Sequence, residues 1–82
     1  MKIQKLINQN IQVLKKAGII EHNLESELIL MHILNWEKAV LISNLNYNLN
    51  DDEIKKNNKI KYEFYFFLGS LFLLGQYINR YH

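Results

Sequence analysis

The sequence predicts an all-α fold, a small bundle of four or five helices that occupies residues 1–82 as a single domain. Apolar residues recur at helical spacing over residues 3–17, and an almost unbroken apolar run fills residues 25–34. A helix-capping pattern opens at Asn50, and the chain contains no proline, the strongest helix breaker. Three of the predicted helices follow from these patterns.

The length and composition of the chain limit what it can be. A chain of 82 residues buries only about 60–65% of the surface that its unfolded form exposes, so every element must contribute to one core. The absence of cysteine excludes disulfides and thiolate metal sites and favours a reduced, cytoplasmic setting. The N-terminal segment lacks the continuous apolar centre of a signal peptide. A net charge of +2 does not by itself argue for a nucleic-acid partner.

The first predicted helix has a single apolar face. The residues of this face are Ile3, Leu6, Ile7, Ile11, Leu14 and Ala17. Lys15 and Lys16 complement the negative end of the helix dipole, and Gly18 can adopt the left-handed conformation of a C-terminal cap. We therefore expect this helix to end at Gly18.

The second predicted helix runs to about Leu34 and is broken by Asn35. We expect Asn23 to cap it, with Glu25 and Glu27 in a first turn where the helix dipole favours carboxylates. That position explains both carboxylates without a catalytic role. The apolar residues of this helix point in nearly every direction, so the other helices should enclose it as a central rod. These residues are Leu28, Ile29, Leu30, Met31, Ile33 and Leu34.

A short third helix is expected over residues 36–43. Its inward residues should be Ala39, Val40 and Ile42, and its outward residues Glu37 and Lys38. The following residues 44–49 alternate polar and apolar side chains as a strand does, but no second strand pattern exists to pair with them. We interpret this segment as a loop held in place by Leu45 and Leu49.

The fourth predicted helix starts with a capping box, in which the Asn50 side chain and the Glu53 carboxylate each bond the other residue's amide. The helical pattern extends to about Tyr77. Gly69 and Gly75 are its weak points, since each costs about 1 kcal/mol relative to alanine.

Candidate catalytic and metal-binding side chains have simpler structural interpretations. His32 lies on an apolar helix and could be a general base or a metal ligand, but His22 and His82 are not at metal-ligand spacing. We expect a partly buried histidine bonded to a backbone carbonyl. The carboxylates of residues 51–53 are interpreted as helix-start residues facing water. We identify no catalytic, cofactor-binding or metal-binding residue.

The rest of the chain leaves several alternatives open. Lys55, Lys56, Lys59 and Lys61 are interpreted as a solvated helix face, the alternatives being contact with an acidic protein or with RNA. The uncharged aromatic segment 64–78 is shorter than the roughly 20 residues that a membrane span needs. We favour a buried helix there over a surface for a second domain or membrane contact. Trp36 and Tyr47 are interpreted as loop anchors.

Several of these positions together resemble one known family. They are Glu27, Leu28, Leu30, His32 and Leu34, followed by Ala39 and Leu41. The pattern resembles the N-terminal domain of the release-factor glutamine methyltransferase family, also called the HemK type. Residues 76–78, Gln-Tyr-Ile, are similar to the junction that precedes the family's catalytic domain. Phe72 and Leu74 depart from the glycine and proline of that junction, and its paired arginines are missing.

The resemblance implies a substrate-recognition domain that binds a class I peptide chain release factor. A separate domain would methylate the glutamine of the factor's Gly-Gly-Gln loop with S-adenosylmethionine. That catalytic domain is absent from these 82 residues, through fragmentation or gene decay, so the chain is not expected to be an enzyme alone or to bind a cofactor.

We expect a monomer that contacts neither nucleic acid nor membrane directly. Candidate partner-binding residues are Lys5, Gln9, Gln12, Lys16 and His22. The alternative is a stand-alone small helical protein whose aromatic C-terminal segment docks to a membrane or self-associates.

Overall fold

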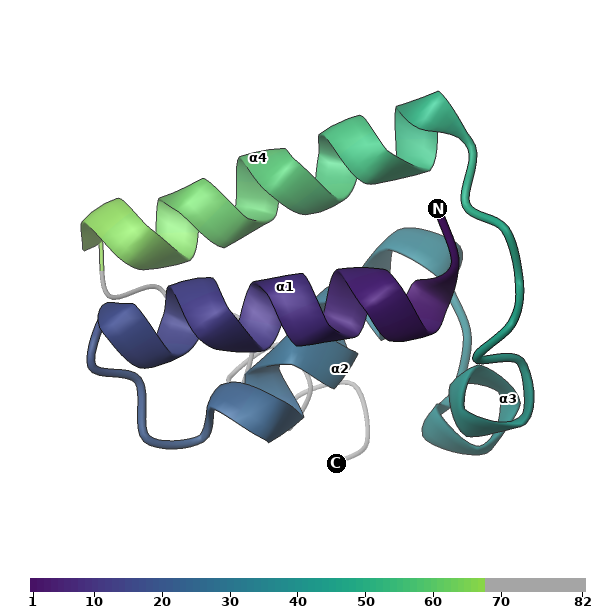
Figure 1. Ribbon diagram of the computed structural model, residues 1–82, viewed down its shortest axis with the longest axis horizontal. Helices are drawn as coiled ribbons and strands as arrows, with labels where there is room; N and C mark the ends of the chain where they lie inside the picture. The colour runs from purple at the N-terminus through teal and green to yellow at the C-terminus, as the bar shows by residue number, and fades with distance from the viewer. Residues whose placement is uncertain (68–82) are drawn as a thin grey trace.

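Four helices make up the part of the chain that the computed structural model describes, which is residues 1–67, with side chains for residues 1–63. They are α1 (Ile3–Lys16), α2 (His22–Leu34), α3 (Lys38–Ser43) and α4 (Asp51–Phe67). α1 and α4 lie side by side, α2 crosses behind α1, and α3 lies at one end of the bundle (Figure 1). The predicted all-α fold is confirmed over these residues.

Several predictions concern the C-terminal part of the chain and lie outside the described residues. They are the continuation of the fourth helix to Tyr77, its weak points at Gly69 and Gly75, and the junction-like residues 76–78. The role of the aromatic segment 64–78 also falls there, because only the helical backbone of its first four residues is described.

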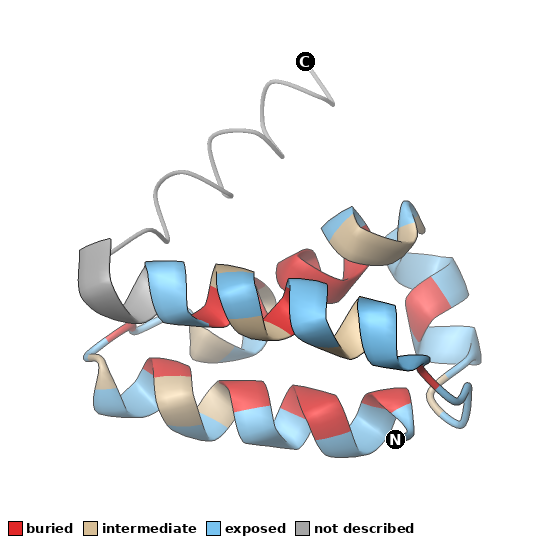
Figure 2. Cartoon of the chain, turned by 90° about the horizontal axis from the view of Figure 1, so that it is seen from above, coloured by how far each residue is buried: buried red, intermediate tan, exposed pale blue. Residues whose placement is uncertain are grey.

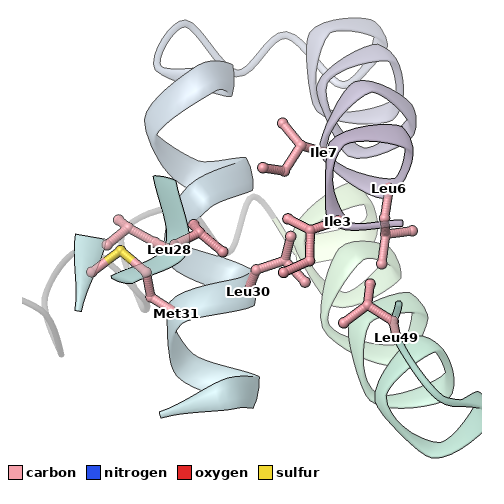
Figure 3. Packing of buried hydrophobic residues seen from close by; sticks show 8 residues of the cluster. Ile3, Leu6, Ile7, Leu28, Leu30, Met31 and Leu49 are labelled. Carbon is pink, nitrogen blue, oxygen red and sulfur yellow. The ribbon is translucent and has the colours of Figure 1, made fainter. Parts of the chain in front are cut away.

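α2 is the centre of the bundle, as its apolar run predicted. It packs against each of the other three helices, so side chains on several of its sides are covered. Four consecutive residues in its middle are buried, namely Leu28, Ile29, Leu30 and Met31. Leu28, Leu30 and Met31 lie in the larger of two core clusters, with Ile3, Leu6, Ile7, Leu41 and Leu49 (Figure 3). Ile29 belongs to the smaller cluster with Leu14 and Ile19.

The start of α2 differs from the prediction. The helix begins at His22, before Asn23, and no side-chain hydrogen bond caps it. Its end is as expected, because Asn35 adopts a left-handed conformation with φ of 54°. The prediction placed the start too late because the turn after α1 is short, with buried Ile19 fixing the chain just before α2.

α1 ends in a Schellman motif around Gly18, which has φ of 81°. The amide of Gly18 donates to the Lys15 carbonyl, and the amide of Ile19 donates to the Leu14 carbonyl, both at 3.1 Å. Leu14 and Ile19 are also in one apolar cluster, which is the hydrophobic contact typical of this motif. The predicted stop at Gly18 is therefore confirmed.

The segment 44–49 is a loop, as predicted, and it caps the start of α1. The amides of Ile3 and Gln4 donate to the carbonyls of Tyr47 and Leu45, each at 3.0 Å, and satisfy two of the helix's free N–H groups. The amide of Leu49 donates to the Met1 carbonyl at 2.8 Å. The loop thus holds the first turn of α1 in place.

Side chains anchor this loop as well. Leu49 is buried, and Leu45 packs against the larger core cluster. The rings of Trp36 and Tyr47 meet edge to face, with centroids 5.1 Å apart, which agrees with the prediction that both are loop anchors.

The predicted inward face of the third helix is wrong. Ala39, Val40 and Ile42 are exposed, and the residue that enters the core is Leu41. α3 also starts later than expected, at Lys38. A helix of six residues makes fewer than two turns, so one side chain suffices to fix it against α2 and its neighbours in sequence point outward.

α4 begins with the predicted capping box. The Asn50 amide donates to the Glu53 carboxylate and the Glu53 amide donates to the Asn50 side-chain oxygen, both at 2.8 Å. Asp52 forms an ion pair with Lys56 at 3.0 Å. Lys55, Lys56 and Lys59 are exposed, as a solvated face requires.

Lys61 does not belong to this solvated face, because it is buried. Loss of hydration lowers the pKa of its ammonium from the ordinary value. Its Nζ lies 5.4 Å from the centroid of the Tyr62 ring, a distance at which the ring face attracts a cation.

Two polar contacts cross the core. The fully buried amides of Asn10 and Asn57 donate to each other, at 2.7 and 3.0 Å, and join α1 to α4. The hydroxyl of Ser26 donates to the Ile7 carbonyl at 3.1 Å and joins α2 to α1. Each contact fixes the position of one helix along another, because a shift would leave a buried polar group without a partner.

Leu30→Ala should lower the free energy of unfolding by about 2–5 kcal/mol, because Leu30 is fully buried at the centre of the larger cluster. A domain this small has about that much stability, so the variant should be largely unfolded at room temperature. Thermal denaturation followed by circular dichroism measures this, with exposed Ile42→Ala as the control. A Leu30→Ala transition close to that of the parent would contradict the enclosed position of α2.

Asn57→Ala should lower the free energy of unfolding by about 1–3 kcal/mol, because it leaves the Asn10 amide buried without a partner. The double variant Asn10→Leu, Asn57→Leu should recover most of that loss, since no polar group then stays unsatisfied. Chemical denaturation of both variants tests the pair. If the losses in free energy of unfolding of the single variants at positions 10 and 57 add up in the double variant, the two amides do not act together.

Candidate protein-binding surface

The outward side of α1 carries four of the five predicted partner-binding residues. Lys5, Gln9, Gln12 and Lys16 are all exposed, and their spacing of four, three and four residues aligns them along one side of the helix. The buried residues of α1 lie on its opposite side, and Figure 2 shows exposed residues along the side that faces away from the other helices. We call these four residues the α1 stripe.

The bundle holds the α1 stripe rigidly. The loop carbonyls bond the first turn of α1, the Schellman motif closes its last turn, and the buried contacts of Asn10 and Ile7 fix its middle. A helix fixed at its start, middle and end loses little further conformational freedom when a partner binds, which favours binding. The α1 stripe is therefore a preorganised surface.

The charged side chains of α1 and its flanking residues are all positive. The first twenty residues contain four lysines and no acidic residue, whereas all eight acidic residues of the chain come later. The lysines of this segment are Lys2, Lys5, Lys15 and Lys16, and all are exposed. Since the whole chain carries a formal charge of +2, residues 21–82 are net negative. The surface of α1 is thus the positive side of a nearly neutral molecule.

His22, the fifth predicted partner-binding residue, is separate from the α1 stripe. It is half-buried and starts α2, beyond the turn that follows α1. Its Nδ1 lies 3.2 Å from the Ile19 carbonyl oxygen, so an Nδ1 proton would donate this hydrogen bond. The ring therefore belongs to the turn and is tied to the backbone there.

His32 differs from its predicted environment. It is exposed on α2, whereas a partly buried ring bonded to a backbone carbonyl was expected. The buried run of α2 ends at Met31, and His32 directly follows it. An exposed imidazole needs no protein partner.

Glu25 is unexpectedly buried for a carboxylate at the start of a helix. It is 1% exposed, and its Oε2 accepts no hydrogen bond within the described part of the protein, so the interpretation as an ordinary helix-start carboxylate is incomplete. Burial, and secondarily the charge of Glu21, raises the pKa of Glu25 to about 7. Such a value suits a general base, but a carboxyl closed off from solvent cannot reach a substrate.

Two features of the bundle were not predicted from the sequence. The exposed apolar side chains of Val40 and Ile42 on α3 were assigned to the core, and nothing in so short a helix distinguishes its faces. The pairing of Asn10 with Asn57 was also missed. Its one signal was the position of Asn10, which lies between Leu6 and Leu14 on the apolar face of α1.

Metal-binding clusters and membrane-spanning helices are absent from the described residues. No three histidine, cysteine or acidic side chains there come close enough together to hold a metal ion. No helix among residues 1–67 has the length and apolar character needed to cross a bilayer. The α1 stripe remains the candidate binding surface.

A known protein-family model matches most of the chain. Residues 5–60, well over half of the chain, match the family model described as the PrmC N-terminal domain. The matched region starts within α1 and includes α2, α3 and the first part of α4. No curated protein and no solved structure matches the chain significantly.

Glu25→Gln should make the stability of the protein less dependent on pH. Because the folded pKa of about 7 lies above the ordinary value of 4.5, rising pH ionises the unfolded carboxyl first. Glu25 therefore lowers the free energy of unfolding as pH rises through this interval, by at most about 3 kcal/mol. The glutamine side chain does not ionise, so Glu25→Gln should not lose free energy of unfolding in this way. The variant should therefore be more stable than the parent at pH 8.

Thermal unfolding at several pH values between 4 and 8 measures the effect. Glu37→Gln is the matched control, because Glu37 is an exposed carboxylate and should leave the pH dependence unchanged. A Glu25→Gln variant that loses stability with pH as steeply as the parent would contradict the assignment.

Proposed function

The chain belongs to the PrmC N-terminal domain family, the N-terminal domain of release-factor glutamine methyltransferase, and we propose that it recognises a class I peptide chain release factor. In this proposal the chain supplies a binding surface and performs no chemistry. Methylation of the factor's glutamine would take place in a separate domain that binds S-adenosylmethionine. The partner and the reaction are inferred from the family to which the chain belongs.

The α1 stripe is the observation that carries this proposal. All four of its residues lie within the matched region, and it combines exposed polar side chains with a rigid backbone. Lysine and glutamine side chains can donate hydrogen bonds to carboxylates and carbonyl oxygens of another polypeptide. A rigid polar helix face of this kind suits recognition of a folded protein.

A membrane-docking or self-associating protein remains the alternative from the sequence. It depends on the aromatic segment 64–78, whose side chains lie outside the described residues. No helix among residues 1–67 is long and apolar enough to span a bilayer, and the recognition role is the function we propose.

Gln12→Trp should weaken binding of the chain to a purified class I release factor about tenfold or more, because an indole in the middle of the α1 stripe prevents close approach of a partner. Isothermal titration calorimetry with the parent and the variant measures the change. Gln12 is exposed, so the substitution should leave the thermal transition within a few degrees of the parent's.

Lys59→Trp provides the matched control, since it places the same ring on an exposed position of α4. It should bind the release factor as the parent does. No detectable binding by the parent would refute the proposed partner. Equal weakening by both variants would refute the use of the α1 stripe.

A further inference from the structure

We infer that the α1 stripe binds an acidic polypeptide segment of its partner, with carboxylates placed opposite Lys5 and Lys16 and hydrogen-bonding groups between them opposite Gln9 and Gln12. The inference rests on the proposed function and specifies the chemistry of the partner's surface.

Charge is unevenly distributed along the chain. The lysines of α1 face solvent in a segment that contains no acidic residue, although the molecule as a whole is close to neutral. A positive surface on a nearly neutral protein attracts a negative partner and repels positive ones, which orients the encounter. An acidic segment therefore complements this side of the molecule.

The two lysines of the α1 stripe are available for ion pairs with a partner. Two other exposed lysines already have carboxylate partners, because Lys38 lies 3.9 Å from Glu27 and Lys56 lies 3.0 Å from Asp52. Within the described residues, no carboxylate forms such a pair with Lys5 or Lys16. Their ammonium groups can bind an external carboxylate without first breaking an internal ion pair.

Helix geometry sets the spacing of the partner's groups. Lys5 and Lys16 are eleven residues apart, which at the rise of an α-helix places them about 16 Å from each other along its axis. Gln9 and Gln12 lie between them on the same side, and each offers two donors and an acceptor. A helix with acidic residues near both ends and polar residues between them matches this arrangement.

A polypeptide fits the α1 stripe better than a nucleic acid does. Single-stranded nucleic acid is held by aromatic rings that stack on bases, and the stripe consists of lysines and glutamines alone. The phosphates of a nucleic-acid strand also need a larger cluster of cations than the two lysines of the stripe and the neighbouring Lys2 and Lys15 supply. The amides in the middle suit carbonyl, hydroxyl or amide groups of a protein surface.

The test compares two charge-reversed variants of the full 82-residue chain in binding to a purified class I release factor. Lys5→Glu with Lys16→Glu should raise the Kd at least about tenfold at low ionic strength. Lys55→Glu with Lys59→Glu makes the same change of charge on α4 and should change the Kd less than about twofold. Binding by the parent should also weaken between about 50 mM and 500 mM salt.

A neutral variant, Lys5→Gln with Lys16→Gln, keeps the test valid if charge reversal near the end of α1 disturbs the helix. Its Kd should lie between those of the parent and the reversed variant, with an unchanged circular dichroism spectrum. A single-stranded RNA of about twenty nucleotides serves as the second probe and should not bind the parent chain.

The outcomes separate the two proposals. Absence of release-factor binding by the parent overturns the proposed function and this inference with it. Parent binding that tolerates both α1 double variants overturns the inference alone and leaves the proposed function standing. Binding of the RNA by the parent, lost in the Lys5→Glu, Lys16→Glu variant, overturns the inference in favour of a nucleic-acid surface.

Discussion

The need to cover α2 on several sides at once determines the arrangement of the bundle. Its middle residues are apolar in consecutive positions, so no single neighbouring helix can bury them all. α1, α3 and α4 each cover part of α2, and the two core clusters meet on it. The outward side of α1 is available to a partner because its inward side is committed to α2 and α4.

Apolar packing alone leaves the positions of the helices along one another loosely determined, since leucine and isoleucine side chains can repack. The buried hydrogen bonds reduce this freedom. Asn10 with Asn57 and Ser26 with Ile7 each form in one relative position of two helices. We expect this restriction to matter for the α1 stripe, because a recognition surface needs a fixed backbone more than a large stability.

Most features that depend on neighbours in sequence could be predicted, although the expected cap of α2 at Asn23 is not formed. The capping box needs residues three apart, the stop at Gly18 needs one glycine, and the apolar run of α2 needs only its own composition. Features that depend on distant partners could not. Asn10 is separated from Asn57 by 47 positions, and the burial of Glu25 comes from packing that the rule for helix-start carboxylates ignores. The polar side of α1 followed from periodicity, whereas the identity of a partner could not be predicted from it.

The capping of α1 by the loop at residues 45–49 bears on how the protein folds during synthesis. α1 leaves the ribosome first, yet the carbonyls that accept its first amides and the side chain that pairs with Asn10 are translated some forty residues later. Contacts between such distant segments form slowly, because a long loop must close before they form. We therefore expect the nascent first helix to lack its start cap and its packing against α4 until those segments emerge, a period in which chaperones can reach part of its apolar face.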